Sequence, residues 1–190
     1  MLLEDSSVAL TKDAIDPHMV GLRRGTARVE PSDARWAAVY DVLKHQLEAL
    51  LAGQAVMVEH VGSTAVPGLP AKPIIDIAIG APPEQWADVI KRLVNGGFED
   101  RGARPEQDEH LLVVPDPTDS DVRVAHLHLV ALDSAKWRDY VRFRDFLRSD
   151  AQCRTWYATL KQQLADEHPN DRAAYTSGKS AFIRDALASR

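Results

Sequence analysis

The stretch over residues 58–80 constrains the fold of this chain more than any other part of its sequence. Residues 55–61 and 73–79 are rich in β-branched side chains and are bounded by glycine and proline, which predicts two strands. A turn of small residues joins them, and a lysine precedes the second strand. The stretch is therefore expected to form a strand–turn–strand unit with a polar turn.

The side chains of this unit favour a phosphate site. Gly62 has no Cβ, so a phosphate could approach the backbone closely, and Ser63 and Thr64 add hydroxyl groups. Lys72 can reach back over the turn. Asp76 lies among apolar neighbours, where a carboxylate usually has a cation, and Mg²⁺ is the expected one. The alternatives are a tight turn that only positions the following Pro-Gly-Leu and an aspartate that is capped or ion-paired for structural reasons.

The same stretch carries a family resemblance. Residues 59–76 follow the pattern E-H-x-G-S-T-x-V-P-G-L-x-A-K-P-x-I-D, and the chain resembles the GrpB family through this segment. Residues 21–26, 126–128 and 143–148 are similar to further family segments, so the likeness extends over about residues 20–190. It implies a nucleotidyltransferase-superfamily fold, with a domain over 21–190. Residues 1–20 show no sustained periodicity, so a flexible arm is expected there.

The resemblance also exposes a departure. Active members of the superfamily carry Asp-x-Asp on the second strand, which places two carboxylates on one face because side chains alternate along a strand. Here Ala78 stands at the second position. Binding of a nucleotide stays expected, whereas catalysis depends on a site with one acid fewer.

Two histidines lie on a later strand. His126 and His128 share one strand face, where the superfamily often places its third carboxylate. Neutral imidazoles ligate transition metals and act as acids or bases, so both are candidate metal ligands with Asp76, and His128 with Asp76 is a candidate catalytic group. The alternative is a pair of hydrogen-bonded structural histidines. Near the turn, His60 or Glu59 can orient the backbone instead of meeting a ligand, and at most one of them faces the pocket.

Basic residues of the C-terminal helices are further candidates for phosphate binding. Lys161 and Lys179 each follow a tyrosine by four residues, Tyr157 and Tyr175, so each pair shares one helix face. A cation beside an aromatic hydroxyl suits a triphosphate or an adenine edge. Arg144 is expected to contact either phosphate or a nearby acid. The alternative for the lysines is simple solvation.

The composition limits the class of protein. A length of 190 residues suits one domain, and a net charge of −5 argues against a general nucleic-acid binder. Cys153 is the only cysteine, which excludes an intramolecular disulfide. There is no apolar run of membrane-spanning length and no secretory signal, so no membrane association and a cytoplasmic location are expected.

The remaining periodicity predicts an α/β or α+β fold. Helices are expected from about 33 to 52, from 82 to 95, and over 134–149, 151–167 and 171–188. Strands are expected near Phe98, over 111–114 and over 122–131, which gives a small mixed sheet flanked by helices and a helical C-terminal part.

Together these features predict a nucleoside-triphosphate-binding protein that transfers a nucleotidyl group to an unknown acceptor. The alternative is a non-catalytic ligand-binding or interaction module. GrpB-like domains fused to dephospho-CoA kinase suggest, by resemblance, an accessory role in coenzyme A metabolism. The chain has no G-x-x-x-x-G-K-[ST] motif, so it is not expected to be that kinase itself.

Overall fold

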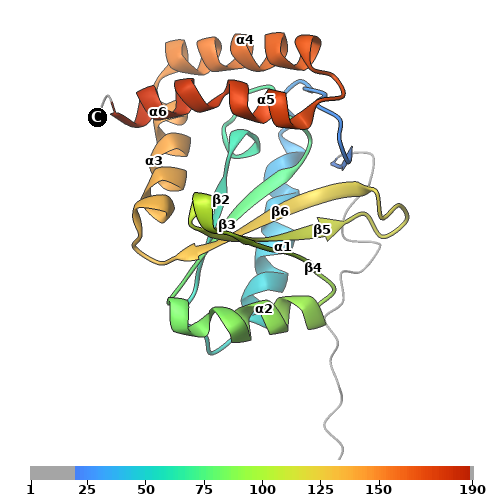
Figure 1. The fold of residues 1–190 in the computed structure, drawn as a ribbon, viewed down its shortest axis with the longest axis vertical. Helices are drawn as coiled ribbons and strands as arrows, with labels where there is room; N and C mark the ends of the chain where they lie inside the picture. Colours follow the sequence, from blue (N-terminus) through green and yellow to red (C-terminus); the bar gives the residue numbers. More distant parts are fainter. Residues whose placement is uncertain (1–19, 189–190) are drawn as a thin grey trace, which may run out of the picture.

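The computed structural model describes residues 20–188 and consists of one mixed sheet between two layers of helices (Figure 1). The predicted arm over 1–20 lies outside the described residues except for Val20, which is buried. The strands are β1 (Leu22–Arg23), β2 (Met57–Val61), β3 (Ile75–Ala81), β4 (Glu99–Arg104), β5 (Glu109–Pro115) and β6 (Val122–Ala131). The helices are α1 (Arg35–Leu50), α2 (Trp86–Asn95), α3 (Ala135–Ser149), α4 (Ala151–Glu167), α5 (Arg172–Gly178) and α6 (Ser180–Ala188).

The sheet has the strand order β2-β3-β6-β5-β4, and the short β1 pairs with β6. Among the strands of residues 20–188, β3 and β6 form the one parallel pair, and β2, β5 and β4 extend the sheet by antiparallel pairing. In the parallel pair Asp76 lies opposite His126, and Ala78 lies opposite His128. Since side chains repeat every two residues, these four residues share one face of the sheet.

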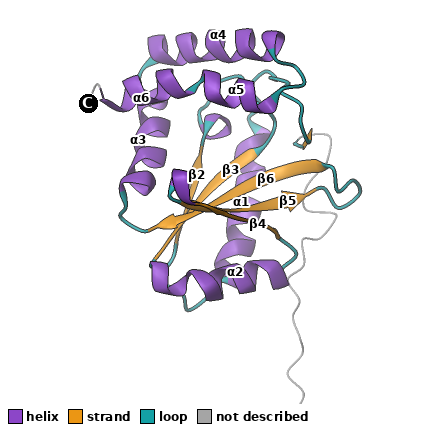
Figure 2. Ribbon diagram, viewed as in Figure 1, coloured by secondary structure: helices purple, strands orange, loops and turns teal. Residues whose placement is uncertain are grey.

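The opposite face of the sheet forms the main core. Ile75, Ile77 and Ile79 pack there against α1 and α2. Helix α1 presents Trp36, Val39, Leu43 and Leu47 at a spacing of three to four residues, which explains why this segment is an amphipathic helix. Figure 2 shows α1 and α2 separated by the sheet from the C-terminal helices. The face that carries Asp76 is thus left to α3–α6.

Side-chain caps explain where three C-terminal helices begin. The side chains of Ser134, Asp150 and Asp171 accept hydrogen bonds from backbone N–H groups in the first turns of α3, α4 and α5. The predicted single helix over 171–188 is instead two helices, because α5 ends at Gly178. Glycine disfavours a helix interior, and Gly178 lies so close to α4 that a Cβ would approach Cδ2 of Leu164 to 2.5 Å.

Candidate functional site

The site lies between the sheet face of Asp76 and the C-terminal helices. The site contains a cavity of about 390 Å³. Ser63 lines it from the turn after β2, Asp76 from β3 and His128 from β6. Lys161 lines it from α4, Arg172 from α5 and Lys179 from the end of α5. The sheet therefore supplies the acid and the imidazoles, and the helices supply cations. In Figure 1 the helices α3 to α6 lie on the other side of the sheet from α2.

The glycine-containing turn forms one wall. Ser63–Ala65 is a single 3₁₀ turn that follows β2, and the Ser63 hydroxyl accepts a hydrogen bond from Lys161 Nζ at 3.0 Å. Thr64 also lines the cavity, but its hydroxyl contacts His60 Nε2 at 3.0 Å and donates to the Ile74 carbonyl at 3.4 Å. Ser63 is consequently the hydroxyl better placed for a ligand, and Thr64 supports the turn.

His60 orients the turn from the core side of the sheet. Its ring stacks on Tyr40 of α1, with the ring centroids 4.5 Å apart. Burial lowers the pKa of His60 to about 4, so the ring is neutral at pH 7 and hydrogen-bonds Thr64. Neither His60 nor Glu59 lines the cavity.

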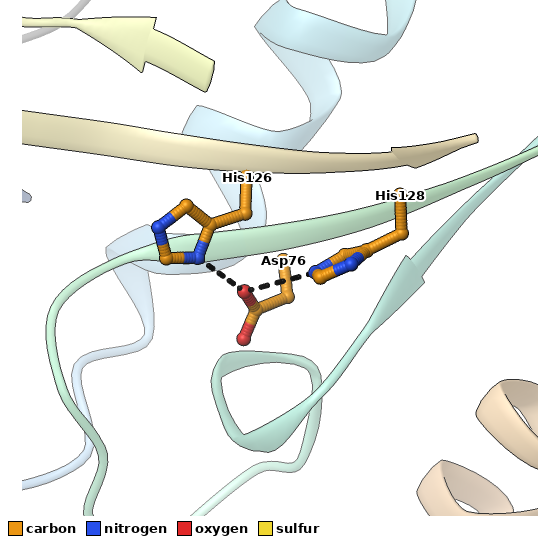
Figure 3. Close-up of side chains that lie close together, drawn as sticks. All are labelled: Asp76, His126 and His128. Carbon is orange, nitrogen blue, oxygen red and sulfur yellow. Dashed lines mark hydrogen bonds and ion pairs between the residues drawn. The ribbon is translucent and has the colours of Figure 1, made fainter. Parts of the chain in front are cut away.

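Asp76, His126 and His128 converge in the cavity (Figure 3). Oδ1 of Asp76 lies 3.0 Å from Nδ1 of His126 and 3.6 Å from Nε2 of His128. Gly62 borders the same carboxylate, since a Cβ at this position would be 2.6 Å from Asp76 Oδ2. The missing side chain of Gly62 thus leaves room for the carboxylate of Asp76. The sequence had suggested room for a phosphate.

Glu109 lies behind His128 and was not identified from the sequence. Its Oε2 accepts a hydrogen bond from Tyr140 at 2.6 Å and lies 3.1 Å from His128 Nδ1, and the residue is only 3% exposed. The strand was expected to begin at Leu111. Extending its alternation by two residues would have placed Glu109 on the face of Leu111 and given a signal for this residue.

The two acids and His128 are ionised together at pH 7. Burial disfavours the charged form of His128, but hydrogen bonds to Asp76 and Glu109 outweigh it and raise the pKa of His128 to about 9. Burial likewise opposes ionisation of Glu109, yet the bond to His128 holds the pKa of Glu109 at about 2. The pKa of Asp76 also lies well below its usual value, because hydrogen bonds to His126 and His128 outweigh the effect of burial. His126 stays neutral because burial lowers its pKa.

Three lysines and one arginine form the opposite wall. Lys161 is 1% exposed; its ammonium also donates to the Pro70 carbonyl and lies 4.8 Å from the centre of the Tyr157 ring. The ammonium groups of Lys72 and Lys179 lie 4.8 and 4.6 Å from the centre of the Tyr175 ring. Tyr175 therefore holds two cations at cation–π distance.

The fourth cation of this wall, Arg172, was not singled out from the sequence. Its Nη2 lies 3.1 Å from His126 Nε2. Arg172 begins α5 three residues before Tyr175, so the two share one side of this helix, and this spacing was the available signal.

The cationic wall is defined here as Lys72, Lys161, Arg172 and Lys179, and Asp76 is the acid that faces all four of these basic groups. Within residues 20–188, no carboxylate forms an ion pair with any of the four. Burial, followed by repulsion from Lys179 and Arg172, lowers the pKa of Lys72 to about 7. Burial also lowers the pKa of Lys179 to about 8, and burial with repulsion from Lys179 lowers that of Lys161 well below its usual value. This wall is suited to a polyanion.

Arg144 lies outside the cavity, so its expected contact with a phosphate finds no support in the geometry. Its guanidinium donates to Glu59 Oε2 at 2.6 Å, to the His60 carbonyl at 3.0 Å and to Asp145 Oδ1 at 2.8 Å. The alternative expectation, an ion pair between Arg144 and a nearby acid, agrees with these contacts. Arg144 ties α3 to β2.

Comparisons with known proteins agree with this arrangement. The family model described as "GrpB protein" matches residues 26–189. The chain belongs to the GrpB family. It is 39% identical over 153 residues to a UPF0157 protein of Streptomyces coelicolor, covering 80% of this chain and 77% of the relative. It is 29% identical over 173 residues to glutamate-rich protein GrpB of Alkalihalophilus pseudofirmus, covering 89% of this chain and 98% of the relative.

Further similarities link the chain to a kinase and to two solved structures. A dephospho-CoA kinase of Mycolicibacterium paratuberculosis is 27% identical over 191 residues, which cover 87% of this chain but 46% of the kinase. The crystal structure of GrpB from Enterococcus faecalis superimposes with a TM-score of 0.74 at 29% identity, covering 85% of this chain and 96% of that one. The poly(U) polymerase Cid1, in a structure bound to MgATP, has a TM-score of 0.50 at 13% identity. This match covers 73% of the present chain and 44% of the Cid1 chain. The likeness to Cid1 shows a nucleotidyltransferase-like fold.

The donor set of this GrpB-family chain does not fit Mg²⁺ well. Mg²⁺ requires oxygen ligands in octahedral geometry, whereas the cluster offers one carboxylate and two imidazoles. Ala78, where a second acid would stand, is 0% exposed and packs with Val61, Val130 and Trp137. The strand face next to Asp76 is therefore apolar and closed.

None of the helices within residues 20–188 combines the length and the apolar character needed to cross a lipid bilayer.

Proposed function

We propose that this GrpB-family protein binds a nucleoside triphosphate in the cavity and transfers its nucleotidyl group to an acceptor hydroxyl. The observation that carries the proposal is the cationic wall, whose four basic groups form no ion pair with a carboxylate among the described residues. The nucleotidyltransferase-like fold supports the same ligand class.

A triphosphate supplies the charge that the wall lacks. Burial of an unpaired cation is costly, which is why the pKa values of Lys72, Lys161 and Lys179 lie below that of free lysine. The polyphosphate is proposed to lie against these lysines and Arg172, with the backbone of Gly62 and the Ser63 hydroxyl beside it. Thr64 is proposed to act by holding the turn, and Tyr175 by holding Lys72 and Lys179.

In the proposed transfer, the α-phosphate lies beside Asp76 and His128. The acceptor oxygen bonds to the α-phosphorus while the bond to the bridging oxygen of the β-phosphate breaks. The hydroxyl proton passes to Asp76, and pyrophosphate leaves against the lysines, which neutralise its charge. In the metal-free protein, the imidazolium of His128 stabilises the charge on the transferred group. Each of these roles belongs to residues that line the cavity.

Calorimetric titration with ATP, GTP, CTP and UTP tests the binding, and release of pyrophosphate tests the transfer. Lys72→Met and Lys179→Met are expected to lower the affinity by at least about tenfold each, since each removes one charge-assisted contact. Lys91→Met is the matched control, because Lys91 is exposed on α2. Wild-type protein that binds no triphosphate would reject the proposal.

The similarity to a dephospho-CoA kinase favours a second candidate, a non-catalytic module accessory to coenzyme A metabolism. The same titration distinguishes the two. Tight binding of coenzyme A or dephospho-CoA without pyrophosphate release would favour the module, because both ligands present phosphates to the cationic wall. Preference for a triphosphate with release of pyrophosphate would favour the transferase. The cytoplasmic location stays a prediction.

A further inference from the structure

We propose that Asp76, His126 and His128 bind a divalent transition-metal ion of the imidazole-preferring class, Zn²⁺ in the first place, and not Mg²⁺. The inference goes beyond nucleotide binding and does not depend on it, because all three ligands come from β3 and β6. It rests on the distances in the cluster, on the support behind His128 and on the position of Arg172.

The distances suit a tetrahedral ion. Zn²⁺ binds nitrogen and carboxylate oxygen at about 2.0–2.2 Å, so the ligand atoms around it lie about 3.4 Å apart. Asp76 Oδ1 lies 3.0 Å from His126 Nδ1 and 3.6 Å from His128 Nε2, and all candidate ligand atoms lie within 4.8 Å of one another. Small side-chain movements would complete the geometry. Three protein ligands would leave the fourth position open to the cavity.

His128 is held from behind as a metal ligand usually is. Glu109 faces Nδ1 of His128 at 3.1 Å and keeps a proton on that nitrogen, so the metal would displace the second proton of the imidazolium, on Nε2, which is turned toward Asp76. Tyr140 fixes Glu109 in turn by donating a hydrogen bond at 2.6 Å. A buried carboxylate on the second nitrogen of a ligating histidine sets both the tautomer and the orientation of the ring. Glu109 is a positioning residue in this scheme.

His126 couples the metal to the cationic wall. In this structure its Nδ1 faces Asp76, and its Nε2 lies 3.1 Å from Arg172 Nη2, which can only donate. A ring that binds a metal through Nδ1 carries its proton on Nε2, and this proton would point at Arg172. The metal and the Arg172 contact therefore exclude each other. Binding of the metal would free Arg172, at the start of α5, to contact the polyphosphate.

The test is a titration of the full chain with Co²⁺, a spectroscopic substitute for Zn²⁺, in the absence of nucleotide. One equivalent is expected to give the visible absorption of a low-coordinate ion, and Zn²⁺ is expected to remove it whereas excess Mg²⁺ is not. Asp76→Asn and His128→Gln should abolish the absorption, and Glu109→Gln should weaken the affinity about 10–100-fold. His45→Gln is the control, since His45 is exposed on α1.

One variant separates a built site from adventitious binding by histidine. Arg172→Met should strengthen metal binding, because it removes the group that competes for His126, while it weakens nucleotide binding. A Co²⁺ spectrum that stays that of the hydrated ion would overturn the proposal, as would displacement of Zn²⁺ by Mg²⁺ at equal concentration. Both of these measurements use the wild-type chain, so they stand even if a variant fails to fold.

Discussion

A Cβ atom on Gly62 would lie 2.6 Å from Oδ2 of Asp76, so Asp76 can keep its position on β3 only while residue 62 of the turn has no side chain. The backbone of Gly62 also has φ = +68°, which disfavours other residues. The turn and Asp76 are therefore one structural unit.

Gly62→Ala tests this unit. The substitution is expected to lower the free energy of unfolding by about 2–4 kcal/mol, from backbone strain and from displacement of Asp76. Gly68→Ala is the matched control: Gly68 has φ = +77°, but a Cβ there meets no atom within 4 Å. Urea denaturation should show a larger loss at Gly62. Equal losses would mean that Asp76 moves aside at no cost.

Lys72→Met should stabilise the fold while it weakens nucleotide binding. The pKa of Lys72 is about 7 in the folded protein and 10.5 in the reference state, so the folded state binds fewer protons between these values. Stability from this group therefore rises with pH from about 7 to 10.5, and at neutral pH Lys72 is destabilising. We expect Lys72→Met to raise the free energy of unfolding, measured by thermal denaturation at neutral pH, by about 0.5–2 kcal/mol. Lys91→Met should change neither property, and a destabilised Lys72→Met would contradict the prediction.

Nucleotide binding is expected to take up protons. Lys72 and Lys179 have pKa values of about 7 and 8 in the free protein, and a bound polyphosphate raises both because it favours the charged form. Affinity should thus be highest below about pH 7 and fall as the pH rises, by up to about tenfold per unit for each lysine. Calorimetry in two buffers of different ionisation enthalpy measures the uptake directly. An affinity that is constant between about pH 6 and 9 would argue against lysines as the ligands.

Arg144→Met should affect stability and not binding. The substitution removes the partner of Glu59 and a donor to the His60 carbonyl, which is expected to cost about 1–3 kcal/mol. A double-mutant cycle with Glu59→Gln should show coupling between the two residues. The exposed Arg184→Met serves as control. Loss of nucleotide affinity in folded Arg144→Met would restore the role in phosphate binding that the sequence suggested.

Ala78→Asp is expected to unfold the protein and not to restore a pair of acids. Ala78 is fully buried among apolar side chains under α3, and an unpaired carboxylate there costs several kcal/mol. Ala87→Asp, at an exposed position of α2, should be nearly neutral. A stable Ala78→Asp protein with faster pyrophosphate release would show that this face opens during the reaction.

Alternation along strands and the family resemblance were sufficient to place Asp76, His126 and His128 together, because the parity of side chains in β3 and β6 is visible in the sequence. They did not reveal Glu109, since the expected strand began two residues too late. The partner of Arg144 was equally hidden: Glu59 lies 85 residues away, and charge alone does not say which acid meets which base.

The break between α5 and α6 follows from packing against Leu164, a contact that no local propensity encodes. The proposed metal and nucleotide sites depend on the same kind of long-range contact. Arg172 meets His126 across 46 residues, and Lys161 meets Ser63 across 98. Such contacts form only when the sheet and the helices pack together, so the local sequence does not predict them.

The division of the cavity between sheet and C-terminal helices has a consequence for the order of synthesis. The sheet that carries Asp76 and Glu109 is complete at the end of β6, while three of the four cations follow on α4, on α5 and in the residue after it. A nascent chain that folds from its N-terminus thus lacks three of the four basic groups of the cationic wall until the residues through Lys179 have left the ribosome. A chain cut between β6 and α4 would keep Asp76, Glu109 and Lys72 but lack most of the basic groups with which the proposed site holds its polyphosphate.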